Sequence, residues 1–256
     1  MNAQSNANLE AGVSLGFASF QTDFGERGDW DSTFKNRGLA VGAVLYLNFF
    51  NRDPVLSGPV SWGQQHFKLK AEVSYLQANL EHYGIYAKED TADGAKLRSM
   101  TGKSTVINFG TILEYHPFPI PDFISGSNRK ISPYFGLGVM AGFSNPTIET
   151  STGDWEANPT LLIDAYQVDG AIDVSSSLAL SLMLSGGLRF KLDDNDSLML
   201  DMRWQYFASD FIDGLDPDPE LVPNKHDDWL YYLNFGYIHK FGPDSKVSTW
   251  FKGRRR

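Results

Sequence analysis

The segment SSSLALSLMLSGGLRFKLDDNDSLMLDMRWQYF, residues 175–207, carries the clearest structural signal in this chain. Leucine recurs at every second position from Leu178 to Leu184, with alanine, serine and methionine between. The alternation returns from Leu198 to Tyr206, after the polar turn 193–196. A period of two is typical of β-strands, so the segment predicts a long antiparallel hairpin. Its arms match the length of about 9–11 residues with which a tilted strand crosses a bilayer.

Six further segments show the same alternation of apolar residues with small or polar ones. They are residues 9–18, 39–48, 67–76, 107–116, 134–144 and 231–241. Hydrophilic stretches follow the first, third, fifth and seventh strands, at residues 21–36, 77–102, 145–174 and 209–228. The links after the second and fourth strands contain prolines, which cannot donate to a strand ladder. The chain therefore predicts eight strands in one all-β domain, residues 1–241, followed by a basic tail, residues 242–256.

Composition excludes several classes of function. The formal net charge of −9 argues against a nucleic-acid binder, because phosphate binding needs a basic surface. The chain has no cysteine, so disulfides and thiolate metal sites are excluded. No motif calls for a cofactor or a small-molecule substrate. The opening residues MNAQSNANLE lack a charged and an apolar signal region, which we interpret as a mature form whose signal peptide has been removed.

An eight-stranded up-and-down barrel has two possible environments. A soluble lipocalin-like cup has its apolar face inside, whereas an outer-membrane barrel turns that face toward lipid; a β-sandwich is a third architecture with similar strands. Long loops on one rim, a short turn at 193–196 on the other and aromatic residues near strand ends favour the membrane barrel. We therefore expect an all-β transmembrane barrel with long extracellular loops, located in the bacterial outer membrane and contacting its lipid.

The strand positions that alternate with the apolar ones include charged residues of both signs. They are Lys68, Lys70, Glu72, Glu114, Arg189, Asp201 and Arg203. An eight-stranded barrel is narrow enough for side chains to fill it, and buried charges must be paired. We therefore expect a structural network in the lumen rather than an open pore, formed by Lys70, Glu72, Glu114, Arg189, Asp201 and Arg203.

Three other groups of residues are candidate sites. The loop before the last strand holds acidic residues whose oxygens suit calcium, although their spacing is not that of an EF-hand: Asp210, Asp213, Asp216 and Asp218. The basic tail includes residues suited to a periplasmic partner or lipid headgroups: Trp250, Arg254, Arg255 and Arg256. The histidines are the candidate bases of a lipid enzyme: His66, His82, His116, His226 and His239. None of them has both a serine nucleophile and an orienting acid nearby in the sequence. We interpret Glu114 and His116 as a hydrogen-bonded pair that plugs the periplasmic end of the barrel.

Four blocks of the chain resemble a known family. They are FQTDFGERGDWDSTFKNRGLAVGAVLYLNF, HFKLKAEVSYLQANLEHYG, ILEYHPFPIPDFISGSNRKISPYFGLGVMAGFSNP and SDFIDGLDPDPELVPNKHDDWLYYLNFGYIHKF. They are similar to the PorG-like outer-membrane β-barrels of Bacteroidota, over residues 9–241. The most specific parts are Pro133, Tyr134, Asn145 and Pro146, together with SDFIDGLDP. The resemblance implies a barrel that ties periplasmic ring subunits of the type 9 secretion system to the outer membrane.

The expected function is therefore a non-enzymatic anchoring or assembly component of a secretion or cell-envelope machine. Its partner-facing surfaces are the links 51–65 and 118–130 and the tail. Two alternatives belong to other classes: a barrel enzyme acting on membrane lipid, and a surface-binding module that uses the acidic extracellular loops.

Overall fold

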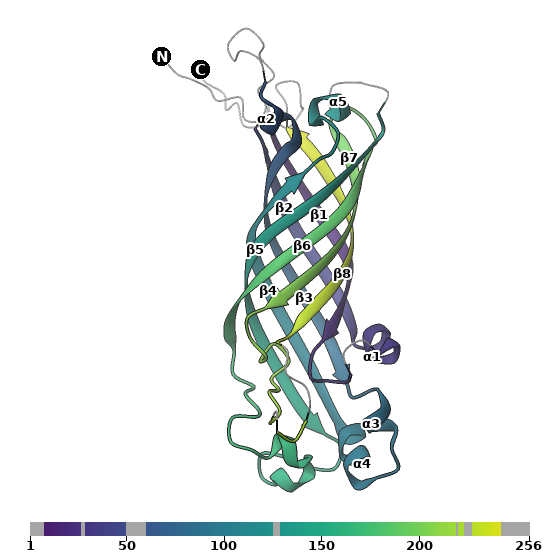
Figure 1. Cartoon of the computed structure of the whole chain (residues 1–256), viewed down its shortest axis with the longest axis vertical. Helices are drawn as coiled ribbons and strands as arrows, with labels where there is room; N and C mark the ends of the chain where they lie inside the picture. The colour runs from purple at the N-terminus through teal and green to yellow at the C-terminus, as the bar shows by residue number, and fades with distance from the viewer. Residues whose placement is uncertain are drawn as a thin grey trace, which may run out of the picture.

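The computed structural model describes residues 8–26, 29–49, 60–124, 129–218, 220–222 and 227–241. Eight antiparallel strands pair in sequence order and the last pairs with the first, so the sheet closes into a barrel (Figure 1). The strands are β1 (Asn8–Gln21), β2 (Arg37–Asn48), β3 (Phe67–Glu81), β4 (Met100–Tyr115), β5 (Ile131–Thr150), β6 (Ser177–Lys191), β7 (Asp196–Phe207) and β8 (Trp229–Phe241). The predicted eight-stranded up-and-down barrel is confirmed.

Short helices lie in the connections at both rims. One rim carries the start of β1, the end of β8, α2 (Trp62–His66), α5 (Ile120–Ile124) and the β6–β7 turn; we call it the short-turn rim. The other, the long-loop rim, carries α1 (Trp30–Lys35), α3 (Ile85–Lys88), α4 (Ala92–Ser99) and the 3-10 turns η1 (Pro159–Leu161) and η2 (Asp164–Tyr166) (Figure 1). In outer-membrane barrels the long loops are extracellular and the shorter turns periplasmic.

Strand alternation sets the two faces of the wall. In β6 the leucines from Leu178 to Leu184 face outward, and Ala179, Ser181 and Met183 are buried between them. Leu180 is 68% exposed and Val139 on β5 is 62% exposed. The apolar parity therefore lies outside, which excludes the soluble cup with an apolar interior.

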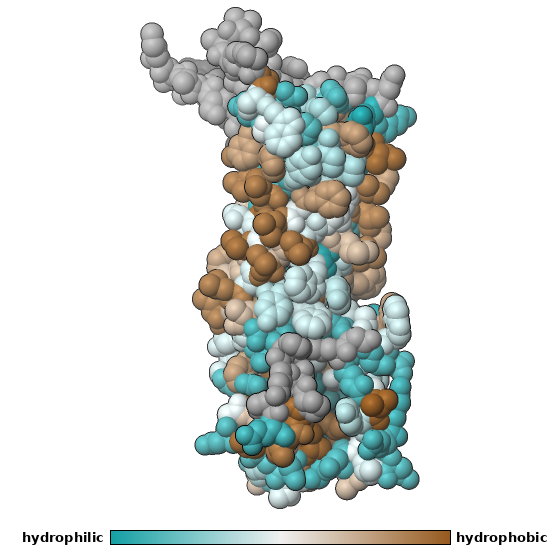
Figure 2. Space-filling model, in the orientation of Figure 1, coloured by the Kyte–Doolittle hydropathy of each residue, from teal (hydrophilic) through white to brown (hydrophobic). Residues whose placement is uncertain are grey.

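Figure 2 shows the apolar side chains as a band on the visible wall, with hydrophilic side chains prevailing at the long-loop end. A continuous apolar surface of this size is stable only against another apolar phase, and closure leaves no unpaired strand edge to expose to hydrocarbon. The chain is a transmembrane barrel of the bacterial outer membrane. None of the helices in the described ranges is long and apolar enough to cross a membrane.

Three strands run further than their apolar alternation predicts. β3 continues to Glu81, β4 begins at Met100 and β5 continues to Thr150, so the loop expected from Asn145 starts at residue 151. The outward positions of the extension of β5 are polar, because they stand beyond the lipid in water. Its inward residue Ile148 still packs on an apolar core. Thus the hydropathy pattern marks the end of the lipid contact rather than the end of the strand.

Candidate functional site

The alternate strand positions that point into the barrel carry polar and charged side chains. Near the short-turn rim, Glu10 on β1 accepts a hydrogen bond from Asn48 (2.9 Å) and pairs with the ammonium of Lys68 at 2.8 Å. The Arg189 guanidinium also donates to Glu10. One carboxylate is therefore shared by two cations, Lys68 and Arg189.

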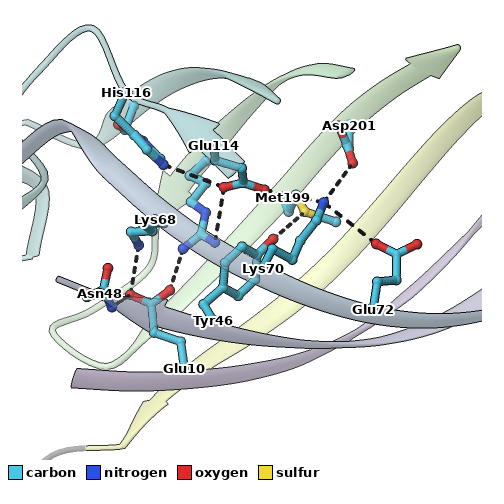
Figure 3. Close-up of polar contacts among 12 residues, drawn as sticks. Glu10, Tyr46, Asn48, Lys68, Lys70, Glu72, Glu114, His116, Met199 and Asp201 are labelled. Carbon is cyan, nitrogen blue, oxygen red and sulfur yellow. Dashed lines mark hydrogen bonds and ion pairs between the residues drawn. The ribbon is translucent and has the colours of Figure 1, made fainter. Parts of the chain in front are cut away.

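A second cluster lies next to it, further into the barrel. The Lys70 ammonium lies 3.3 Å from Glu114, 3.6 Å from Glu72 and 3.7 Å from Asp201. Figure 3 shows Lys70 between these three carboxylates. Arg203 pairs with both Glu72 and Asp201. Arg189 links the two clusters, because its second nitrogen lies 3.9 Å from Glu114.

The ring of Tyr46 forms a platform under the cations of both clusters. The Arg189 guanidinium lies 4.1 Å from the ring centroid, and the ammonium groups of Lys68 and Lys70 lie 5.8 and 5.9 Å from it. Its hydroxyl donates to the sulfur of Met199 at 3.4 Å. The ring face attracts cations electrostatically, so Tyr46 stabilises charges that are shielded from water.

The network is neutral in sum. It contains four cations, Lys68, Lys70, Arg189 and Arg203, and four carboxylates, Glu10, Glu72, Glu114 and Asp201. The structure thus brings together all six residues of the expected network. Two residues outside the expected network, Lys68 and Glu10, also belong to it, and both are buried at inward strand positions. The signal for Glu10 was its parity in the first strand, which it shares with Gly12 and Ser14.

Toward the long-loop rim the lumen becomes uncharged and then apolar. Asn108 and Gln205 exchange hydrogen bonds, and Tyr232 and Ser181 bond to them in turn. Beyond this layer lies an apolar core that includes side chains from strands and loops alike, which we call the outer cap: Phe20, Phe24, Leu80, Met100, Ile148, Leu162, Tyr166, Phe207, Ile212 and Leu215. The barrel is therefore filled by charged, polar and apolar layers in succession.

A serine, a histidine and a glutamate form a chain at the inner side of the short-turn rim. Ser132 Oγ lies 3.3 Å from His116 Nδ1, and His116 Nε2 lies 3.5 Å from Glu114. Local sequence did not reveal this chain, because Ser132 is on the next strand. All three residues are at most 1% exposed, and Glu114 is already engaged by Lys70 and Arg189. A cavity of about 20 Å³ beside Arg189 is large enough for a water molecule, and none of these three residues lines it.

The other histidines lie apart from one another. His66 bonds the carbonyl of His116 at 2.6 Å, and His239 bonds the carboxylate of Asp196 at 2.7 Å at the edge of the short-turn rim. His82 lies in the outer cap, where its Nδ1 accepts from the backbone N–H of Gly25 at 3.3 Å. Burial lowers the pKa of His82 to about 3, so the ring is neutral at physiological pH. His226 lies outside the described residues.

Of the four aspartates expected to bind calcium, Asp213 lies in a group of three buried carboxylates. Asp213 lies with Asp23 and Asp228, each offering an oxygen within 4.8 Å of the others, and Asp210, Asp216 and Asp218 are not in that group. Asp213 accepts backbone hydrogen bonds from Phe24 (3.2 Å) and Leu215 (2.8 Å). Its observed contacts therefore tie two long loops together. Asp23 comes from the β1–β2 connection and Asp228 stands just before β8, so neither lies near Asp213 in the sequence.

The expected partner-facing residues are described only in part. Trp250, Arg254, Arg255 and Arg256 of the tail lie outside the described residues, as do residues 51–59 and 125–128 of the two links. The remainder of those links forms α2 and α5, where Val60 packs on Ile120, Phe123 and Ile124. Trp62 is 61% exposed and stacks on His66 with the ring centroids 4.9 Å apart.

No protein-family model and no curated protein matches the chain. Among solved structures, the chain is similar to the attachment invasion locus protein Ail of Yersinia pestis (11% identity, TM-score 0.43, covering 91% of this chain and 99% of that one). It is also similar to Neisserial surface protein A (10%, 0.45, 91% and 97%) and to a major outer membrane protein of Thermus thermophilus (12%, 0.45, 91% and 99%). At these identities and TM-scores the likeness carries no conclusion about function.

Proposed function

We propose that this protein is a non-enzymatic outer-membrane anchor, an assembly component of a secretion or cell-envelope machine of the type 9 kind. The observation that carries the proposal is the filled and neutral lumen. Four cations and four carboxylates are paired inside it, and the outer cap closes the end beyond them. A barrel with such a filled interior is suited to act as a rigid membrane anchor rather than as an open pore.

The short-turn rim supports the same proposal. It carries two packed helices, α2 and α5, on the side that faces the periplasm in outer-membrane barrels. Of this rim, the blocks that resemble PorG-like barrels include α5 and the end of β8. The proposed partners are therefore periplasmic subunits that dock on α2, α5 and the basic tail.

Site-specific photo-cross-linking in the source bacterium tests this proposal. A cross-linking residue fits at Gly63 of α2, because a side chain there would meet no atom within 4 Å. The matched control is the exposed Glu156 in the β5–β6 loop. We expect products with periplasmic lipoprotein or ring subunits of the secretion system from position 63 only, identified by mass spectrometry. Identical products from both positions, or unchanged cargo secretion after deletion of the gene, would contradict the proposal.

A lipid hydrolase is the second candidate, and the chain of Ser132, His116 and Glu114 is the observation that favours it. The burial of these three residues argues against a hydrolase, because the acyl carbonyl of a substrate must reach the serine oxygen. The test is acyl-ester and lipopolysaccharide hydrolysis by the purified wild type beside Ser132→Ala and His116→Ala. Turnover by wild type that both substitutions abolish would establish the enzyme and refute the anchor as the sole function.

A further inference from the structure

Four large apolar side chains are exposed outside the strand wall at the long-loop rim. Trp30 and Phe34 of α1 are 74% and 57% exposed, and their rings stack with centroids 5.5 Å apart. Ile85 and Tyr86 of α3 are 63% and 53% exposed. Exposed apolar side chains that gather on one structure are a sign of a contact surface.

Polar contacts hold α1 and α3 together as one unit. Asp31 of α1 pairs with Lys88 of α3 at 2.7 Å and with Lys35 at 3.3 Å. Glu26 accepts backbone hydrogen bonds from Ile85 (2.8 Å) and Tyr86 (3.3 Å) at the start of α3. We call this unit, α1 and α3 with Glu26, the rim bracket.

The rim bracket begins where the lipid-facing surface ends. The last apolar outward residues of β1 and β2 at this rim are Phe17 and Leu39, and the next outward positions are Ser19 and Arg37. Ser19 donates to the carbonyl oxygen of Thr33 in α1 at 2.5 Å. The helix is therefore fixed to the wall one step beyond the lipid contact, and Figure 1 shows it projecting sideways from the barrel.

We propose that the rim bracket is an interfacial anchor that lies in the outer leaflet, with Trp30 and Phe34 at the boundary between headgroups and acyl chains. The occupant is lipid because the apolar side chains continue a surface that already faces lipid. Amphipathic aromatic rings such as that of Trp30 favour this depth of a membrane.

The headgroup that fits is anionic. Arg37 is exposed at the next outward position beyond Leu39, where the apolar surface of β2 ends. Asp31, the acidic residue of α1, is already engaged by Lys35 and Lys88. The phosphate groups of lipid A match this arrangement, with Arg37 as the principal contact.

The absence of cysteine from the sequence allows a direct test with single labels. Trp30→Cys and Phe34→Cys, each carrying an environment-sensitive fluorophore, are reconstituted in phosphatidylcholine vesicles that contain lipid brominated near the headgroup. Leu15→Cys on the lipid-facing wall is the positive control, and Glu156→Cys in the β5–β6 loop is the negative control. With lipid brominated near the headgroup, we expect several-fold more quenching at positions 30 and 34 than at position 156. With lipid brominated near the ends of the acyl chains, we expect less quenching at positions 30 and 34 than at position 15.

Quenching at 30 and 34 equal to that at 156 would overturn the proposal. So would labels that are shielded from aqueous iodide yet not quenched by bromolipid, because a protein would then cover the surface. Adding lipid A should increase quenching at position 34 in the otherwise unchanged protein, and Arg37→Gln should remove the increase. No response to lipid A would overturn the assignment of an anionic headgroup. A barrel that no longer binds periplasmic subunits would leave these results unchanged, so this test is independent of the proposed function.

Discussion

Arg189 on β6 reaches across the lumen to Glu10 on β1, a residue 179 positions earlier in the sequence. Neither strand pairs with the other in the sheet, so the contact bridges the interior instead of following the ladder. Because Arg189 also approaches Glu114 and the ring of Tyr46, it connects three strands besides its own. The lumen is thus a cross-linked core made of charges, and its stability depends on keeping the charges matched.

Removing a single carboxylate should destabilise the barrel strongly. Glu10→Gln leaves Lys68 and Arg189 with one fewer counter-charge in a site closed to water, a loss of about 3–5 kcal/mol in the free energy of unfolding for buried pairs. The measurement is unfolding by urea in detergent, with the gel mobility of unboiled samples as the readout of the folded fraction. Glu149→Gln on the exposed end of β5 is the control and should change the free energy by less than about 0.5 kcal/mol. Equal midpoints for the two variants would show that the charge match is unimportant.

Removing a cation together with its carboxylate should restore part of the loss. In Glu72→Gln/Arg203→Gln the lumen regains neutrality, and Lys70 still faces Asp201. We expect the double variant to be more stable than Glu72→Gln alone, with a coupling of about 0.5–3 kcal/mol between the two changes. Strictly additive losses in the double-mutant cycle would contradict this interpretation.

The cost of a charge on the outer wall should depend on depth. Leu184 faces outward in the middle of β6, opposite Leu137 of β5, whereas Leu178 faces outward at its end near the long-loop rim. Leu184→Arg should cost about 2–4 kcal/mol and Leu178→Arg about 0–1 kcal/mol. Unfolding in lipid vesicles measures both, with Thr147→Arg on the exposed extension of β5 as a neutral control. An equal cost at positions 184 and 178 would place the lipid contact elsewhere on the wall.

The carboxylate of Asp213 should hold the outer cap closed. Asp213→Asn weakens the hydrogen bonds from the Phe24 and Leu215 amides, and bonds to a charged group contribute about 1.5–3 kcal/mol each. We expect faster amide exchange in the β1–β2 and β7–β8 connections and an unchanged rate in β6. Asp169→Asn, an exposed change in the β5–β6 loop, serves as the comparison and should leave all of these rates as they are.

Acid should loosen the outer cap through His82. Burial lowers its pKa in the folded protein to about 3, against the usual histidine value of 6.5, so below pH 6.5 the unfolded state binds a proton that the folded state does not. Stability contributed by this residue is complete above pH 6.5 and falls between pH 6.5 and 3, by at most about 1.4 kcal/mol per pH unit.

Amide exchange at Gly25, whose N–H bonds His82, reports this opening at pH 7 and pH 5. His82→Phe keeps an aromatic ring against Phe24 and removes the titrating group. The ratio of exchange rates at the two pH values, corrected for intrinsic exchange, should be smaller in the variant. The same ratio in wild type and variant would assign the opening to another group.

The period of two in the sequence determined much of this molecule. It predicted the number of strands and which side of each strand is apolar. It also predicted the inward positions of Lys70, Glu72, Glu114, Arg189, Asp201 and Arg203. These properties follow from the local geometry of a strand, in which successive side chains point to opposite faces. The polar extensions of β3, β4 and β5 escaped prediction because water on the outside removes the hydropathy contrast while the ladder continues.

Only the tertiary structure decided which of those residues meet. Closure of the sheet and the stagger of its strands bring Glu10 to Arg189, Ser132 to His116 and Asp213 to Asp23, and these pairs come from segments with no local pattern in common. Strand alternation assigns a side chain to the lumen but leaves its height and its partner open. Those depend on the register of all eight strands together, which is a property of the closed barrel and of no single segment.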